Sequence, residues 1–332
     1  MKYPFVSIIV PVRNEEKYIG ECLEAIFSQT YPKERMEVLV VDGMSEDKTR
    51  DIAKKFPVKI LDNPNLQRVF ALNIGIKHAK GDIILRVDAR TRIPENYVQK
   101  CIETILETKA DNVGGVQRAL VEGGALQKAI ALAANHHFGV GDAPYRLGTK
   151  SGYVDSVYLG CFKKEVFDKV GLFDQEAPII SEDADINCRI IKAGGKVYLN
   201  KDIVAYYIPR DNLKDLWRLY FRYGGARAGF FLKHKILRWR QVVPILFVST
   251  LIMLLILALI SNNPVIFFIW SSLLGIYFLA DIIVSVTLSL GQRDIYLFPF
   301  LVLVFPCMHF AWAFGFIRRI LYNPKPGEYW KY

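Results

Sequence analysis

The stretch Ile83-Ile84-Leu85-Arg86-Val87-Asp88 is a short, mostly apolar run that ends at a carboxylate. A run of this length, rich in branched aliphatic residues, predicts a buried β-strand over Ile83–Val87. Strands that are apolar on both faces are typical of parallel sheets covered by helices on both sides. The sequence therefore places Asp88 at the carboxyl end of a buried strand.

The rest of the first 110 residues repeats this alternation of strands and helices. Strands are predicted at Val6–Val10, Glu37–Val41 and Val58–Leu61, and helices at about Glu15–Gln29, Asp47–Lys55 and Arg68–His78. The alternation predicts an α/β domain with a mostly parallel central sheet. Ligands of such sheets bind beyond the carboxyl ends of the strands. The polar residues expected there are Arg13, Asn14, Asp42 and Asp88.

The pattern weakens between about Gly114 and Ser156, where we expect a helix followed by loops over the substrate cleft. Helical periodicity returns at Lys164–Val170 and Asp183–Ala193. The stretch Asn212–Phe231 is amphipathic and mixes Trp, Tyr and Arg, a composition suited to a helix in the membrane interface. An ordinary surface helix of the α/β domain is the alternative.

The C-terminal third is almost free of charge. Segments 242–261, 264–286 and 295–317 are each long enough to cross a bilayer as a helix. If Arg240 is cytoplasmic, three full spans place Arg318 and Arg319 outside, against the positive-inside preference. Because the third segment contains Pro299 and Pro306, a re-entrant or broken span is the alternative.

Composition supports a membrane protein. Hydrophobic residues make up 52% of the 332 residues, and the net charge is +10. The basic cluster directly before the first apolar segment explains part of that charge. No nucleic-acid recognition motif accompanies it, so we expect no nucleic-acid partner. The run Phe5–Val10 is too short for a signal peptide, and we expect a cytoplasmic catalytic domain on a multi-pass cell-membrane protein.

Six motifs together resemble the family 2 glycosyltransferases. On the donor side they are Val10–Glu16 (VPVRNEE), Val41–Thr49 (VDGMSEDKT), Ala71–Ile76 (ALNIGI) and Gly81–Asp88 (GDIILRVD). On the acceptor side they are Gly160–Phe167 (GCFKKEVF) and Ser181–Arg189 (SEDADINCR). The resemblance covers about residues 4–230, and the nearest subgroup is the succinoglycan-type enzymes with C-terminal membrane helices.

This resemblance implies a GT-A fold, a nucleoside diphosphate sugar as donor and inverting chemistry. We expect a GT-A domain over residues 1–235, with a nucleotide-sugar half (1–110), an acceptor half (111–211) and an interfacial stretch (212–235). A membrane domain over 236–320 and a tail over 321–332 follow.

The resemblance also assigns residues to the donor. Asp42 is expected to accept a hydrogen bond from uracil, beside the backbone of Pro11 and Val12, although an Asp-Gly turn would also explain an Asp before Gly43. The remaining candidates for the nucleotide sugar are Arg13, Glu15, Arg68, Asp88 and Arg90.

The family's DxD motif reads Asp88-Ala89-Arg90 here, so its third position cannot ligate a cation. One interpretation keeps Mg²⁺ or Mn²⁺ on Asp88, with the diphosphate completing the coordination. In the other, Arg90 or Arg92 neutralises the diphosphate directly.

For the acceptor, the resemblance makes Asp183 the general base, with Glu182 beside it. Asp183 or Asp185 would otherwise cap the helix, a role that falls more naturally to Ser181. Arg218 and Arg222 are candidates for a lipid phosphate. They stand where processive relatives carry a QxxRW motif, which is absent, so addition of a single sugar is favoured.

The expected function is transfer of a sugar, from a UDP sugar by family habit, to a lipid-linked acceptor in cell-surface glycan or glycolipid synthesis. A polyprenyl-phosphate sugar synthase is the enzymatic alternative. A catalytically silent scaffold that binds nucleotide or lipid is the alternative of another class, motivated by Arg90. The sugar, acceptor, linkage and oligomeric state stay open.

Overall fold

The computed structural model describes residues 3–175 and 182–322 and divides the chain into two compact units. The first consists of Met1–Leu120 and Ala143–Ile208, and the second of Val121–Asp142 and Pro209–Tyr332. Residues 121–142 and 212–235, which are predicted to belong to the GT-A domain, group with the C-terminal helices in the structure.

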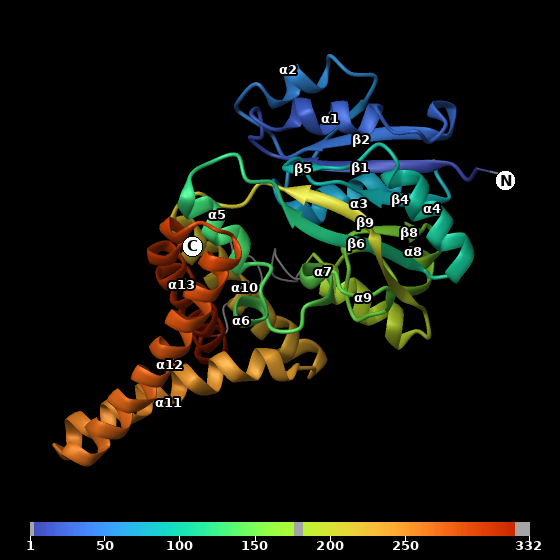
Figure 1. Ribbon diagram of the computed structural model, residues 1–332. Helices are drawn as coiled ribbons and strands as arrows, with labels where there is room; N and C mark the ends of the chain where they lie inside the picture. Colours follow the sequence, from blue (N-terminus) through green and yellow to red (C-terminus); the bar gives the residue numbers. More distant parts are fainter. Residues whose placement is uncertain (1–2, 176–181, 323–332) are drawn as a thin grey trace. The chain divides into compact units, whose positions relative to one another are not determined.

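The first unit is built on one mixed sheet (Figure 1). Its path runs β3-β2-β1-β4-β8-β6-β9-β5, and β7 pairs with β9. The first four strands of this path are parallel, as the sequence predicted, whereas β8 joins β4 and β6 in antiparallel fashion. The strands are β1 (Val6–Val12), β2 (Met36–Asp42), β3 (Lys59–Asp62), β4 (Ile83–Arg86), β5 (Thr91–Arg92), β6 (Asn112–Ala119), β7 (Gly152–Tyr153), β8 (Tyr158–Lys163) and β9 (Val197–Tyr207).

Helices cover both faces of this sheet. Successive residues of a strand point to opposite sides, and apolar residues on both sides need a covering layer. Ile8 of β1 belongs to a core shared with α1 and α4, and Ile9 belongs to a second core shared with α3 and α9. The helices of this unit are α1 (Ile19–Phe27), the 3₁₀ turn η1 (Lys33–Arg35), α2 (Thr49–Ala53), α3 (Arg68–His78), α4 (Tyr97–Thr108), α7 (Pro144–Leu147), α8 (Glu165–Val170) and α9 (Glu182–Lys192).

Two predictions about this unit were wrong in detail. Helix α1 begins at Ile19 rather than near Glu15, because Glu15 lies in a loop where its backbone N–H donates to Thr49. The region after Gly114 was expected to lack strands, yet β6 continues to Ala119. A Cβ on Gly115 would lie 1.9 Å from the carbonyl oxygen of Ile203, so this Gly permits a close approach of β6 and β9.

The second unit is helical. Its core joins α5 and α10 to the last helix, α13, through residues such as Ile130, Leu216 and Phe305. Helix α13 continues past Pro306 without a break, so the alternative of a broken third span does not apply to it. The elements are α5 (Ala125–Ala133), α6 (His137–Val140), α10 (Leu213–His234), α11 (Trp239–Ser261), α12 (Pro264–Gly291), the 3₁₀ turn η2 (Ile295–Leu297) and α13 (Phe298–Leu321).

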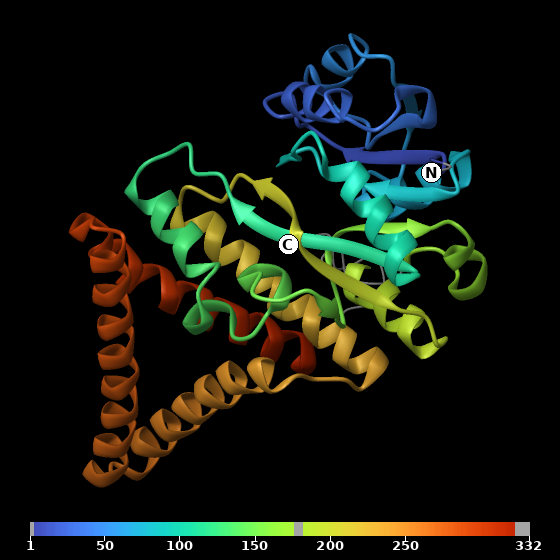
Figure 2. The same cartoon turned by 45° about the vertical axis from the view of Figure 1, so that its right-hand side comes forward.

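Helices α10 and α13 pack with their backbones in close contact, and Figure 2 shows the two helices lying against each other. A Cβ on Gly224 of α10 would lie 1.9 Å from the carbonyl oxygen of Trp312. A Cβ on Gly315 of α13 would lie 1.9 Å from the carbonyl oxygen of Phe221. Small residues at a helix crossing let two backbones touch, which is a common means of packing helices in membranes.

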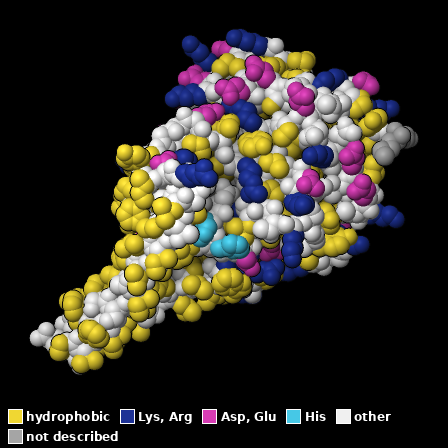
Figure 3. All heavy atoms as spheres, in the orientation of Figure 1, with side chains coloured by type: hydrophobic (Ala, Val, Ile, Leu, Met, Phe, Trp, Pro, Cys, Tyr) yellow, Lys and Arg dark blue, Asp and Glu magenta, His cyan; other side chains and the backbone are white. Residues whose placement is uncertain are grey.

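Among residues 3–175 and 182–322, three helices are long and apolar enough to cross a membrane. They span Trp239–Ser261, Pro264–Gly291 and Ile295–Leu321. Side chains along α11 and α12 are mostly apolar and exposed, and they form the yellow surface at the lower left of Figure 3. An exposed apolar surface of this extent is what a bilayer would cover.

Candidate active site

The centre of the first unit's polar cluster is a buried arginine, Arg86, at the end of β4. Its Nε and Nη2 donate to the two oxygens of Asp88 at 2.7 and 2.9 Å. Its Nη1 donates to Asp183 at 2.6 Å and to Glu182 at 3.1 Å. One planar guanidinium therefore joins the carboxylate just beyond β4 to the acidic pair at the start of α9.

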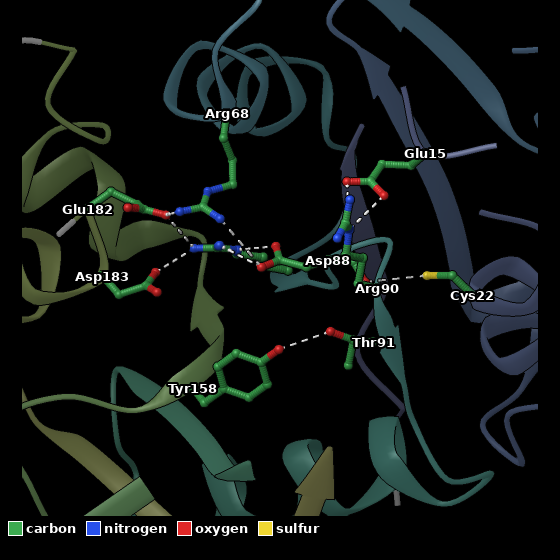
Figure 4. Close-up of polar contacts among 10 residues, drawn as sticks. Glu15, Cys22, Arg68, Asp88, Arg90, Thr91, Tyr158, Glu182 and Asp183 are labelled. Carbon is green, nitrogen blue, oxygen red and sulfur yellow. Dashed lines mark hydrogen bonds and ion pairs between the residues drawn. The ribbon is translucent and has the colours of Figure 1, made fainter. Parts of the chain in front are cut away.

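A second guanidinium, that of Arg68 on α3, enters the same cluster. It lies 2.5 Å from Glu182 and 3.8 Å from Asp88. Figure 4 shows Glu182 and Asp183 on one side, Asp88 facing them, and Arg68 reaching in between. Five charged groups thus lie together, three negative and two positive, and the pairing offsets the cost of burying them. Arg68, which is predicted to bind the nucleotide sugar, therefore lies near both Asp88 and Glu182.

The two aspartates of the cluster differ in how readily they hold a proton. Burial would raise the pKa of Asp88, but Arg86 and Arg68 outweigh it and hold that pKa below its usual value. Burial raises the pKa of Asp183 to about 6, although Arg86 opposes the shift. The side chain of Asp183 is still 32% exposed. An accessible carboxylate with a pKa near neutrality is well suited to remove a proton.

Asp42 lies in a separate cluster at the end of β2. It is fully buried, and its oxygens accept from the hydroxyl of Ser45 at 2.5 Å and from Arg50 at 3.0 Å. Arg50 also pairs with Asp62. Pro11 and Val12 are buried on the neighbouring strand, where Val12 is the register partner of Asp42. The backbone beside Asp42 is thus the one that the sequence analysis named.

Arg90, the residue at the third position of the DxD motif, bonds to Glu15. Its Nε lies 2.9 and 3.1 Å from the two oxygens of Glu15, and its guanidinium stacks 4.9 Å from the ring centre of Tyr18. Two residues predicted to bind the nucleotide sugar are therefore bonded to each other. Arg92 pairs with Glu21, and Arg13 is exposed.

The remaining predicted residues lie elsewhere or outside the description. Arg218 and Arg222 are exposed on α10 in the second unit, and Arg218 is 3.5 Å from Asp215. Ser181, the expected helix cap, lies outside the described residues. Glu182, predicted as an acceptor-side residue, is buried in the cluster.

Sequence reasoning missed Arg86 as a site residue. The signal was present, because an arginine inside an otherwise apolar strand must find a buried acidic partner. Which acids would pair with it could not be read from the chain, since Glu182 and Asp183 lie 96 and 97 residues away.

The mixed α/β sheet of the first unit is that of a GT-A-type glycosyltransferase, as a solved structure shows. Mannosyltransferase PcManGT from Pyrobaculum calidifontis, solved with GDP-Man and Mn²⁺, has this fold. It matches with a TM-score of 0.62 and 20% identity, over 98% of this chain and 89% of that one.

Sequence comparisons give the family. Residues 7–167 match the model of glycosyl transferase family 2. Succinoglycan biosynthesis protein ExoA of Rhizobium meliloti is 31% identical, over 95% of this chain and 94% of the relative. A dolichyl N-acetyl-alpha-D-glucosaminyl phosphate 3-beta-D-2,3-diacetamido-2,3-dideoxy-beta-D-glucuronosyltransferase of Methanococcus voltae is 30% identical, over 96% and 97%. The chain belongs to glycosyl transferase family 2 and is a glycosyltransferase of glycan biosynthesis.

Proposed function

We propose that this chain is an inverting glycosyltransferase that moves one sugar from a nucleoside diphosphate, UDP in the first instance, to a lipid-linked acceptor. The observation that carries the proposal is the joint contact of Asp88 and Asp183 with Arg86, which brings a donor-side acid and an acceptor-side acid to one place. A single displacement needs such an arrangement, because nucleophile and leaving group act on opposite sides of one carbon.

In this reaction Asp183 is the general base. It takes the proton of the acceptor hydroxyl while that oxygen forms a bond to the anomeric carbon. The bond between the anomeric carbon and the diphosphate oxygen breaks, and its electron pair leaves with the diphosphate. The pKa of about 6 keeps Asp183 mostly ionised at neutral pH, which supports this role.

A divalent cation fits the site if it arrives with the donor. Among the described residues, no group of three or more His, Cys, Asp and Glu side chains is placed to hold a metal. Asp88 is partly exposed, and Oε2 of buried Glu182 has no hydrogen-bond partner, so the cluster retains acceptor capacity. Mg²⁺ is commonly held by one or two carboxylates plus phosphate oxygens. We therefore propose Asp88 as the ligand of Mg²⁺ or Mn²⁺, which would neutralise charge on the leaving diphosphate.

Binding of the nucleotide is proposed for Pro11, Val12, Arg13, Glu15, Asp42, Arg68 and Arg90. Asp42 would accept from the base, and Arg90 would turn from Glu15 toward the diphosphate. The side chain of Arg90 is 39% exposed, and an ion pair in contact with water is weak enough to permit such a movement.

The lipid part of the proposal follows from the second unit and the relatives. Three apolar helices support a multi-pass membrane protein. We propose a cytoplasmic catalytic unit because basic residues stand directly before the first of these helices. The Methanococcus voltae relative is named for a dolichyl-linked sugar acceptor, which supports a lipid-linked acceptor here. Arg218 and Arg222 are the candidates for its phosphate.

The test uses the full chain in detergent. Thermal shifts with UDP, GDP and their sugars, with and without Mn²⁺, identify the donor, because a ligand that binds the folded state raises its apparent stability. Transfer from that donor is then measured to a polyprenyl-linked sugar and to bare polyprenyl phosphate.

Transfer to the polyprenyl-linked sugar with inversion at the anomeric carbon is the expected result. Transfer to bare polyprenyl phosphate alone would replace the proposal with a sugar synthase. Retention of configuration would contradict the single displacement. Nucleotide-sugar binding without any transfer would favour a silent scaffold.

A further inference from the structure

We propose that Arg86 is a positioning residue of the transfer reaction, which holds the carboxylate of Asp183 in register with Asp88. The inference rests on the proposed role of Asp183 as base and goes beyond it by assigning the group that places the base. It concerns a buried arginine in strand β4, whose other residues are all aliphatic.

The first step of the argument is the geometry. The guanidinium of Arg86 uses Nε and Nη2 as a fork on the two oxygens of Asp88, and turns Nη1 toward α9. A planar guanidinium fixes the directions of its donors, so the position of Asp88 dictates where Nη1 points. The position of the Asp183 carboxylate is therefore fixed by Arg86 and Asp88 as well as by helix α9.

The second step is burial. The side chain of Arg86 is 5% exposed, whereas that of Asp183 is 32% exposed. A partly exposed acid at the beginning of a helix has several rotamers open to it. A rigid buried donor at 2.6 Å selects one of them. Misplacing a reacting group by about 1 Å can reduce a rate by about 100-fold.

The third step is the comparison with an arginine on α9 itself, Arg189, whose side chain is 21% exposed. Arg189 of α9 pairs with Asp185 at 2.9 Å and donates to the carbonyl oxygen of Leu172 at 2.8 Å. It ties α9 to the loop before it, and none of its bonds to the described residues reaches Asp88 or Asp183. Arg189 thus serves as a control for loss of a partly buried arginine that supports α9.

The experiment is a double-mutant cycle on the full-length enzyme, built from Arg86→Lys and Asp183→Asn. Lysine keeps the charge but has one ammonium group, so it cannot hold Asp88 as a fork and reach Asp183 at the same time. Arg86→Lys should lower kcat by about 100-fold, while the Kd of the nucleotide measured without divalent metal stays within about threefold. In the Asp183→Asn background the same change should lower kcat by less than about threefold, since residues that act as a unit are not additive.

Each outcome decides one point. If Asp183→Asn keeps near wild-type kcat, the base assignment of the proposed function fails, and this inference falls with it. If Asp183→Asn is inactive but Arg86→Lys costs about 100-fold again in that background, the base stands and the positioning role is wrong. An equal loss of kcat in Arg189→Lys would show a general effect of loosening α9 and would also overturn the inference.

Arg86→Gln is the second variant in case the lysine variant does not fold. It should show the same loss of kcat and the same non-additivity with Asp183→Asn. Failure of both Arg86 variants to fold, with Arg189→Lys folded, would assign Arg86 to stability and reject the positioning role.

Discussion

The two units of this enzyme solve the problem of close packing in opposite ways. The catalytic unit brings segments about 100 residues apart together through opposite charges, with Arg86 between Asp88 and Asp183. The second unit brings α10 and α13 together by removing side chains, with Gly224 and Gly315 at the crossing. Charge fixes position in the first case, and shape fixes it in the second.

The difference teaches what each region tolerates. A charge cluster accepts changes of volume more readily than changes of charge, because an unpaired buried charge is costly. The contact between α10 and α13 at Gly224 and Gly315 tolerates added volume poorly, because the neighbouring atoms belong to the facing backbone and cannot move aside alone. Substitutions that alter only charge or only volume therefore separate the two regions.

The largest effect is expected for Asp183→Asn, which removes a charge and keeps the shape. Loss of a general base lowers kcat by about 10²–10⁴-fold. The nucleotide should still bind, because the carboxylate of Asp183 belongs to the acceptor side. Single-turnover transfer and nucleotide titration measure the two quantities. Near wild-type turnover in this variant would contradict the assignment.

The second prediction tests shape in the other unit. Gly315→Ala adds one methyl group 1.9 Å from the carbonyl oxygen of Phe221, so α10 and α13 must separate. Overpacking of this kind costs about 1–3 kcal/mol. The thermal midpoint of the purified chain should fall by several degrees.

Gly275→Ala is the matched control for that prediction. It is the same substitution in α12, at a position where a Cβ meets nothing within 4 Å. Its midpoint should stay the same or rise slightly, because Ala favours helix. Equal losses in both variants would show that the crossing has no special role in stability.

The first part of the sheet could be predicted from the sequence because each of its strands has a recognisable local pattern. Ile83–Val87 and Val6–Val10 are apolar runs next to turn residues, and the parallel order followed from the alternation with helices. Strand β6 was missed because its Gly114-Gly115 pair has little strand propensity. Gly115 is required because the backbone of Ile203 approaches it closely, and this contact depends on the tertiary structure.

The site was predicted in the same uneven way. Asp42, Asp88 and Asp183 were named because each stands in a recognisable motif. The bond between Arg90 and Glu15, and the place of Arg68 beside Glu182, depend on how distant loops meet. Local patterns predict which residues are at strand ends, and only the fold decides which of them pair.

The third prediction concerns the second charge cluster. Asp42→Asn removes the negative charge that pairs with Arg50 and would also accept a hydrogen bond from the base of the nucleotide. Loss of a charge-assisted hydrogen bond costs about 2 kcal/mol, or about thirtyfold in the Kd of the nucleotide. Asp62→Asn removes the exposed partner of the same Arg50 and should change that Kd by less than about threefold. Equal effects on nucleotide binding would mean that Arg50, rather than Asp42, governs it.

The smallest effect is expected from pH, and it tests whether charge at Asp183 matters in its own right. Burial raises the pKa of Asp183 to about 6, and only the ionised form accepts a proton. Between pH 7 and pH 5 the ionised fraction falls about tenfold, so kcat at saturating substrates should fall about tenfold as the pH is lowered. Above pH 7 it should level off. A flat profile down to pH 5 would mean that the base has an ordinary carboxylate pKa. In Arg86→Gln the midpoint should move to higher pH, because the cation that lowers the pKa of Asp183 is gone.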